Sequence, residues 1–148
     1  MAKVDESRVE TGAVAQQRHG QHHHLSWPSQ EDRIRTVFGL PADAPLPRVN
    51  EETLTRYHIH MAGKLAMPFE ALYCQTSGEM RQLIHYVHVT ELIDPRRSRP
   101  STLHHGLSCK AGNSKDMLDL PLSELGVREE NPNCQLLDDY AYWFVNWR

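Results

Sequence analysis

The chain has 148 residues, a length typical of one domain, and its net charge of −3 is too small to indicate a nucleic-acid or membrane partner. Its apolar runs are far shorter than the about 20 residues of a membrane helix, and residues 1–8 lead into no apolar signal segment. We therefore expect a cytoplasmic protein. Residues 94–115 hold five basic side chains against one acid, whereas residues 116–148 hold seven acids against two basic ones. These regions either neutralise each other in the fold or present separate surfaces to different partners.

Residues 1–26 are polar and show no periodic apolar pattern. Such a composition buries too little apolar surface to offset the entropy of ordering, which predicts a disordered tail. The histidine run His22–His24 is able to bind transition metals as an isolated peptide, but a solvated tail is the favoured interpretation.

Residues 27–48 are predicted to form a short helix and a proline-rich connector. Ser29 and Asp32 form a variant of the capping box, and Gly39 supplies a stop. One helical face is apolar and comprises Ile34, Val37 and Phe38. The segment Leu40–Arg48 contains three prolines and should be extended.

A second helix is predicted to begin after Asn50, whose side chain is able to cap the first turn, and to end at Pro68. Its core-facing stripe comprises Leu54, Tyr57, Met61 and Leu65. Four strands should follow, at residues 69–74, 83–93, 106–111 and 117–122, with a short turn at Ser123–Val127.

A last helix is predicted after Asn133, with an apolar stripe formed by Leu136, Tyr140, Trp143, Phe144 and Trp147. Two helices, four strands without intervening helices and a final helix indicate antiparallel pairing. The predicted class is α+β, with N-terminal and C-terminal helices packed on a small curved antiparallel sheet of about four strands.

Three well-separated cysteines, Cys74, Cys109 and Cys134, form no CxxC pair. They predict neither a disulfide framework nor a zinc ribbon, and each is interpreted as a small buried hydrophobe. The sequence also lacks phosphate-loop, dinucleotide, nucleophile-elbow and EF-hand motifs. A nucleophilic pair of Cys109 with His104 or His105 is much less favoured than a structural cysteine, so we expect no enzymatic activity.

Calcium takes six to eight oxygen ligands, usually including two or more carboxylates. The acids that are able to converge lie on or beside the predicted strands and on the last helix; they are Glu70, Glu91, Asp94, Asp116, Asp119, Asp138 and Asp139. Spacing alone does not assemble them, because each acid taken singly is more often a solvated surface residue.

Four motifs resemble, in order, those of the CcbP-type calcium-binding family. They are NEETLTRYHIHMAGKLAMPFEALY at 50–73, VHVTELID at 87–94, LDLPLSEL at 118–125 and LLDDYAYWFVNW at 136–147. The resemblance covers about residues 49–147, and the PLSEL segment together with the last helix is its most specific part.

The resemblance implies an α+β domain over residues 49–148 with a small barrel-like sheet. It also implies calcium-ion binding of the buffer or sensor type through surface carboxylates. The acids that match the family pattern, and that the resemblance marks as metal ligands, are Asp94, Glu124, Asp138 and Asp139.

The chain departs from the family at Arg96–Arg99, where relatives carry an acid-rich loop. Three arginines at close range would repel calcium, which places any site elsewhere and makes the Asp138-Asp139 pair the best-matched motif. We accordingly expect weak binding. The alternative is a small barrel-like protein-interaction module that has lost calcium binding and uses this loop, with His104 and His105, to contact an acidic protein partner.

Overall fold

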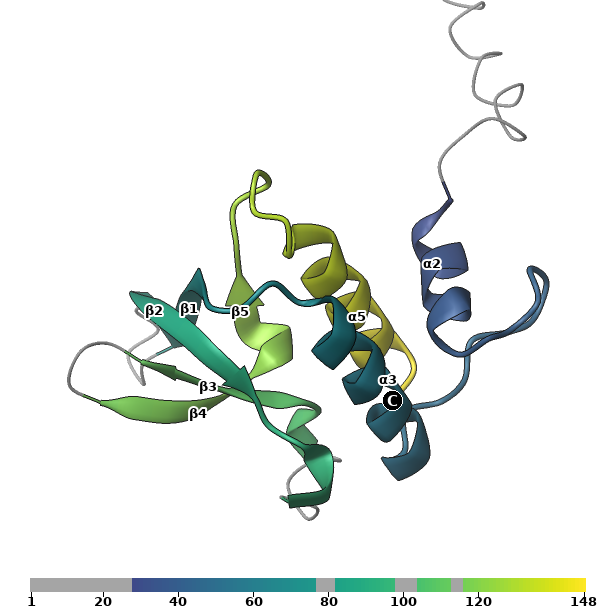
Figure 1. Ribbon diagram of the computed structural model, residues 1–148, viewed down its shortest axis with the longest axis horizontal. Coiled ribbons are helices and arrows are strands. Elements are labelled where there is room, and N and C mark those ends of the chain that lie inside the picture. Colours follow the sequence, from purple (N-terminus) through teal and green to yellow (C-terminus); the bar gives the residue numbers. More distant parts are fainter. Residues whose placement is uncertain (1–27, 77–81, 98–103, 113–115) are drawn as a thin grey trace, which may run out of the picture.

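The computed structural model describes residues 28–76, 82–97, 104–112 and 116–148, so the predicted tail at 1–26 lies outside the described residues. Its elements (Figure 1) confirm the α+β class, with five strands rather than about four. In chain order they are α2 (Gln30–Val37), α3 (Glu51–Lys64), β1 (Phe69–Thr76), β2 (Gln82–Leu92), the 3₁₀ turn η1 (Pro95–Arg97), β3 (Ser108–Gly112), β4 (Met117–Pro121), the 3₁₀ turn η2 (Leu122–Glu124), β5 (Leu125–Gly126) and α5 (Cys134–Asn146).

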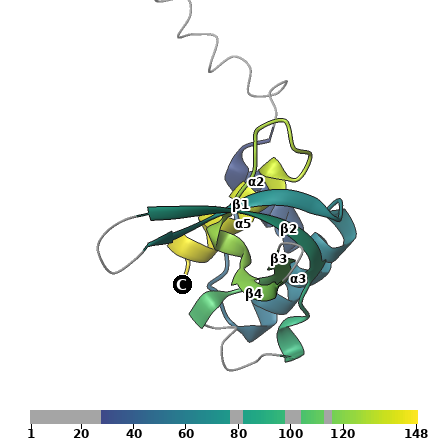
Figure 2. The ribbon, with the colours of Figure 1, turned by 90° about the vertical axis from the view of Figure 1, so that its left-hand side faces the viewer.

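The five strands form one antiparallel sheet in the order β4-β3-β2-β1-β5. The sheet is strongly curved (Figure 2) but open, with β4 and β5 as its edge strands among the described residues. The additional strand β5 lies where the sequence predicted only a turn, and it pairs with β1 through Leu72–Gly126 and Tyr73–Leu125. A two-residue strand is too short to show an alternating pattern, which explains why the sequence did not reveal it.

Helix α2 begins as predicted, because the Ser29 side chain accepts a hydrogen bond from the backbone N–H of Asp32 at 3.1 Å. It ends near Gly39, whose φ of +66° favours glycine. Ile34 and Phe38 from this segment are buried in the main core. The N-terminal helix is therefore packed into the same core as the rest of the fold.

Helix α3 is capped by Asn50, whose side chain accepts from the Thr53 backbone N–H at 2.9 Å, while the Thr53 hydroxyl accepts from the Asn50 N–H. This reciprocal arrangement satisfies two backbone donors of the first turn. The helix ends at Lys64, before the predicted stop at Pro68.

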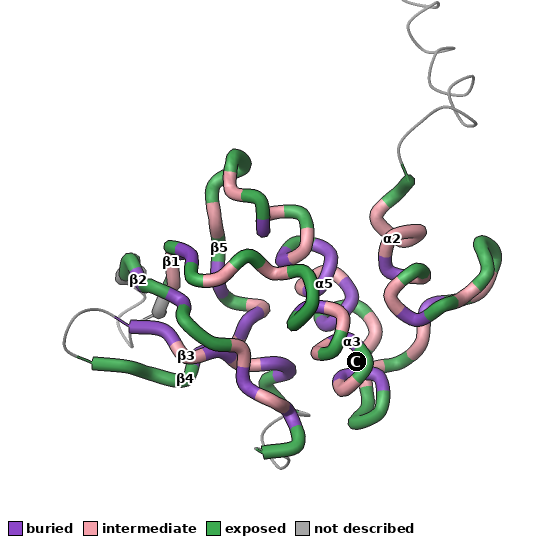
Figure 3. The backbone as a smooth tube through the Cα atoms, in the orientation of Figure 1, coloured by how far each residue is buried: buried purple, intermediate pink, exposed green. Residues whose placement is uncertain are grey.

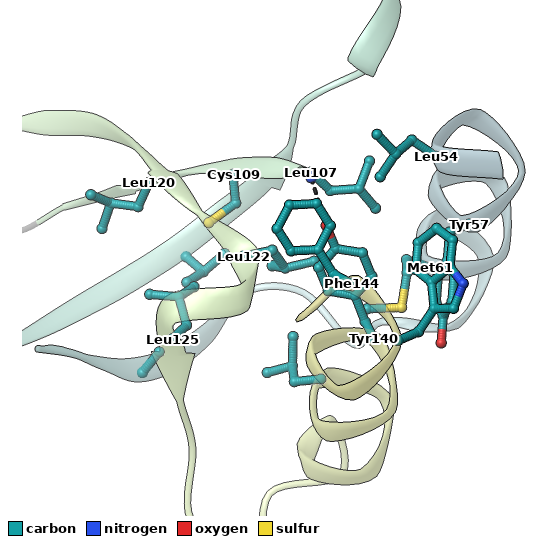
Figure 4. Close-up of a cluster of buried hydrophobic side chains, with 14 of the residues drawn as sticks. Leu54, Tyr57, Met61, Leu107, Cys109, Leu120, Leu122, Leu125, Tyr140 and Phe144 are labelled. Atoms are coloured by element: carbon teal, nitrogen blue, oxygen red, sulfur yellow. Dashed lines mark hydrogen bonds between the residues drawn. The ribbon is translucent and has the colours of Figure 1, made fainter. Parts of the chain in front are cut away.

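The core lies between the helices and the concave face of the sheet, and Figure 3 shows buried segments in α3, α5 and β3. Tyr57 of α3 stacks on Trp143 of α5 at 5.0 Å between ring centroids and meets the Tyr140 ring edge-on at 5.2 Å. The Tyr140 hydroxyl accepts a hydrogen bond from the Leu107 backbone N–H at 2.7 Å (Figure 4). Helix α5 thus joins the helical layer to the loop that precedes β3.

The three cysteines are free thiols, and only Cys109 is buried as the sequence predicted. Cys74 is exposed because it lies on the outer face of β1, and Cys134 is half-buried at the start of α5. Within the described residues, none of the helices combines the length and the apolarity that crossing a membrane requires.

Candidate metal centre

Asp94, the first of the four predicted ligands, lies between β2 and η1. Its Oδ2 accepts a hydrogen bond from Arg96 Nη2 at 2.8 Å, and its Oδ1 accepts from the Nε and the backbone N–H of Arg96 at 3.1 and 2.9 Å. The Arg96 side chain, followed by its backbone N–H, holds the pKa of Asp94 well below its ordinary value. A calcium ion at Asp94 would therefore have to displace a guanidinium group of the same chain.

The predicted arginine-rich loop is described only in part, since Arg99 lies outside the described residues. Arg96 pairs with Asp94, and Arg97 Nη2 lies 3.5 Å from Glu91 Oε2. Both described arginines are thus bound to acids of their own chain. They neutralise the nearby carboxylates instead of leaving them to a cation.

Asp139 lies on α5 at the interface with α2, and its side chain is only 8% exposed. Arg33 donates to both carboxylate oxygens, from Nε at 2.8 Å and from Nη2 at 2.9 Å, and Gln30 donates to Oδ1 at 3.0 Å. Hydrogen bonding to Asp139 raises the pKa of the Arg33 guanidinium. A buried carboxylate requires such a partner, so Asp139 serves to connect α2 to α5 in this structure.

Glu124 and Asp138 are exposed and lie on different elements, η2 and α5. The Cys134 thiol, one helical turn before Asp138, donates a hydrogen bond to Asp138 Oδ2 at 3.7 Å. Over the described ranges, no three His, Cys, Asp or Glu side chains lie close enough together to hold a metal ion. The four carboxylates marked by the resemblance therefore do not converge on one point.

The structure instead gathers acids at the start of α5, in a group that we call the acidic turn: Glu129, Glu130, Cys134 and Asp138. The pKa of the Cys134 thiol is raised by partial burial, then by the charge and hydrogen bond of Asp138, and further by the charges of Glu129 and Glu130. Three negative charges thus act on one sulfur atom. In the part of the chain that the structure describes, no Lys, Arg or His side chain forms an ion pair with any of the three acids.

Local hydrogen bonds hold this turn in place. Asn131 donates its N–H to the Arg128 carbonyl at 2.9 Å, and Cys134 donates to the Asn131 carbonyl at 3.0 Å. Asn133 was predicted to cap α5, but its side chain makes no capping bond; it is buried and forms two hydrogen bonds with the backbone of Ala66, at 2.8 and 3.0 Å. The turn is therefore fastened to the segment that joins α3 to β1.

A family model described as calcium binding, that of the CcbP proteins, matches residues 48–144. The chain belongs to the CcbP calcium-binding family. No curated protein and no solved structure matches this chain. The match takes in α3, the sheet and nearly all of α5, whereas α2 lies outside it. In this CcbP-type protein, Asp139 is thus bound by a helix that the family match does not include.

The described residues fit calcium only in part. The acidic turn supplies up to three carboxylates without cationic partners, which suits a hard divalent cation, but it forms no closed cage of six to eight oxygens. A hollow of about 460 Å³ borders the turn at Glu130 and Asn131, and its lining also includes Glu70, Tyr86 and Arg128. A calcium ion bound here would therefore take most of its ligands from water.

Sequence reasoning selected Asp138 but missed Glu129 and Glu130, because the family motifs end before them and resume after them. A usable signal was present in REENPNC at 128–134: two adjacent acids precede a Pro-Asn turn that leads directly into a helix. The turn places Glu129 and Glu130 near enough to the start of the helix for their charges to raise the pKa of Cys134.

Proposed function

We propose that this protein is a non-enzymatic calcium-binding protein of the buffer or sensor type, and that the acidic turn attracts the ion through the negative charges of Glu129, Glu130 and Asp138, with water supplying most of the ligands. The observation that carries the proposal is that the backbone hydrogen bonds of the turn place Glu129 and Glu130 just before the helix that carries Asp138, and that none of these three acids forms an ion pair among the described residues. Membership of a calcium-binding family supports the choice of ion. The three free thiols are consistent with a reducing compartment, so we further propose that the protein acts in the cytoplasm.

The remaining predicted ligands are weaker candidates. Asp94 and Asp139 already bind Arg96 and Arg33, so calcium at either position must break an ion pair. Glu124 stands apart on η2. With few charged ligands and water in the other positions, the expected dissociation constant is in the range of about 10⁻⁵–10⁻³ M.

The alternative, an interaction module that recognises an acidic partner, is less favoured. It requires the arginines at 96–99 to be available, yet Arg96 and Arg97 bind Asp94 and Glu91. An acidic peptide would therefore have to compete with two carboxylates that are tethered in place.

The test is isothermal titration of the full-length chain with calcium chloride, and separately with magnesium chloride. The double variant Glu130→Gln/Asp138→Asn should weaken calcium binding by at least about tenfold, because it removes two of the three negative charges of the acidic turn. The matched control is Glu51→Gln/Glu52→Gln, which removes two exposed acids from the start of α3 and changes the net charge equally. It should leave the affinity within about twofold.

Absence of heat at millimolar calcium in the unmodified chain would reject calcium binding. Equal weakening by both double variants would show that only the overall charge matters. Unchanged binding in Glu130→Gln/Asp138→Asn would keep calcium as the ligand but reject the acidic turn as its site.

A further inference from the structure

One end of the sheet exposes apolar side chains, one of which, Tyr86, also lines the hollow beside Glu130. Within the described ranges, six large hydrophobic residues are at least 50% exposed. Four of them lie at this end of the sheet: Ile84 (62%), Tyr86 (73%), Met117 (50%) and Leu118 (54%). They border a hollow of about 580 Å³ between β2 and β4, whose floor includes Val87 and Leu120. Apolar side chains gathered in this way are typical of an interaction surface.

The same end of the sheet has an open backbone edge. β2 pairs with β1 over residues 82–89, but it pairs with β3 only from His88 onward. Within the described residues, Ile84–Val87 therefore have a strand neighbour on one side only. In Figure 2 this end of the β1–β2 hairpin projects away from the other strands.

Residues 84–87 of this edge carry none of the usual side chains that protect against strand pairing. Proteins normally guard an exposed edge with charged residues or proline, because unpaired N–H and C=O groups recruit other strands. The stretch Ile84-His85-Tyr86-Val87 contains no Asp, Glu, Lys, Arg or Pro. Residues 84–87 thus carry no carboxylate, ammonium or guanidinium group, and two identical copies of this edge do not repel each other.

We propose that residues 84–87 of β2 pair with the same edge of a second copy of this chain, antiparallel about a twofold axis at His85. In this register Ile84 of each copy lies opposite Tyr86 of the other, and both are outer-face positions, since they pair across β1 with Cys74 and Leu72. Such cross-strand pairs of an aromatic and a β-branched residue are favourable.

The area required for a stable dimer defines the rest of the interface. A standard interface covers about 800 Å² per partner, which is more than a four-residue edge supplies. The exposed Met117 and Leu118 at the tip of β4 lie beside the same hollow and provide the additional apolar surface. The interface thus combines backbone pairing along β2 with apolar packing against β4.

The oligomeric state of the full-length chain, measured by sedimentation equilibrium from about 1 to 200 µM, tests this proposal. We expect a concentration-dependent dimer whose dissociation constant rises at least about tenfold in Ile84→Lys. The matched control is Ile59→Lys: Ile59 lies on α3, is 66% exposed and should leave the dimer intact. A monomer at 200 µM would overturn the proposal, as would equal loss of dimer in both variants.

A cross-linking experiment tests the register. Residues on the twofold axis face each other with Cα atoms about 4.5–5.5 Å apart, which lies within disulfide range. In a chain carrying Cys74→Ser and Cys134→Ser, oxidised His85→Cys should form a covalent dimer, whereas Ile59→Cys should not. Equal cross-linking of both variants, or no cross-link from His85→Cys, would reject the proposed pairing.

Discussion

The α2–α5 interface and the acidic turn are both rich in carboxylates, yet they use them in opposite ways. At the interface, Asp139 binds Arg33 through both oxygens, and Glu31 accepts a hydrogen bond from the Tyr142 hydroxyl at 2.7 Å. In the acidic turn, the acids have no cationic partner among the described residues. Asp138 and Asp139 are neighbours in sequence, but successive helical residues diverge by about 100°, so one faces α2 and the other faces the turn.

This difference shows that the availability of acids, more than their number, determines where a cation is able to bind. A carboxylate that is already bidentate to a guanidinium contributes to folding and holds no net charge for an incoming ion. Unpaired acids that share a small region repel one another, and a divalent cation relieves that repulsion. The predictions below perturb the two regions separately.

The largest loss of stability should come from Trp143→Ala, which removes a side chain that packs α5 against α3 and against the end of α2. Trp143 is fully buried, lies 5.3 Å from the Phe38 ring centroid and donates its indole N–H to the Pro47 carbonyl at 2.9 Å. Truncating a buried aromatic residue costs about 3–5 kcal/mol of the typical 5–15 kcal/mol unfolding free energy. Urea denaturation followed by circular dichroism should show a marginally stable protein; a midpoint equal to that of the parent would refute this packing.

The second-largest effect on stability should distinguish Asp139 from its neighbour Asp138. Asp139→Asn should lower the unfolding free energy by about 2–4 kcal/mol, somewhat less than for a fully buried pair, because the Arg33 side chain is partly exposed. Asp138→Asn on the exposed face of the same helix should change it by less than about 0.5 kcal/mol. Urea denaturation in the presence of a chelator measures both values. Similar losses in the two variants would contradict the assignment of Asp139 to the interface.

The sequence predicted the helices well because their signals are local. Caps at Ser29 and Asn50 and the apolar stripes on α3 and α5 depend only on residues within a few turns of each other. The strand β5 was missed because its pairing with β1 joins residues more than 50 positions apart and spans two residues. The burial of Ile34 and Phe38 likewise depends on where the proline-rich connector positions α2 relative to the core.

The candidate site was less predictable, because pairing between distant side chains decides it. The motif that marked Asp138 and Asp139 gave no means of distinguishing them, since Arg33 lies more than 100 residues away in sequence. The pairing of Asp94 with Arg96 was more accessible, as the two residues are only two positions apart. The sequence identified that arginine as repelling calcium, and the structure adds that it binds the aspartate itself.

The smallest expected effect is a change in the reactivity of the Cys134 thiol, which depends on the charge of the acidic turn. Asp138, Glu129 and Glu130 raise the pKa of this half-buried thiol, so removing a negative charge should lower the pKa and increase the thiolate fraction at a fixed pH. Alkylation by iodoacetamide at pH 8, followed by peptide mass spectrometry, should therefore be faster at Cys134 in Asp138→Asn than in the unmodified chain. Exposed Cys74 and buried Cys109 serve as internal references, because their alkylation rates should not change. Burial raises the pKa of Cys109 to about 12.

Calcium should act on Cys134 in the same direction if it binds at the acidic turn. A bound divalent cation neutralises the surrounding carboxylates, while the soft thiol is a poor ligand for this hard ion and stays free to react. Millimolar calcium should therefore accelerate alkylation of Cys134 in the unmodified chain and have little effect in Glu130→Gln/Asp138→Asn. Sodium chloride at equal ionic strength controls for general screening of charge. If calorimetry detects calcium binding while Cys134 reacts at an unchanged rate, the ion occupies another site, and the unpaired acids of the turn are solvated surface charges only.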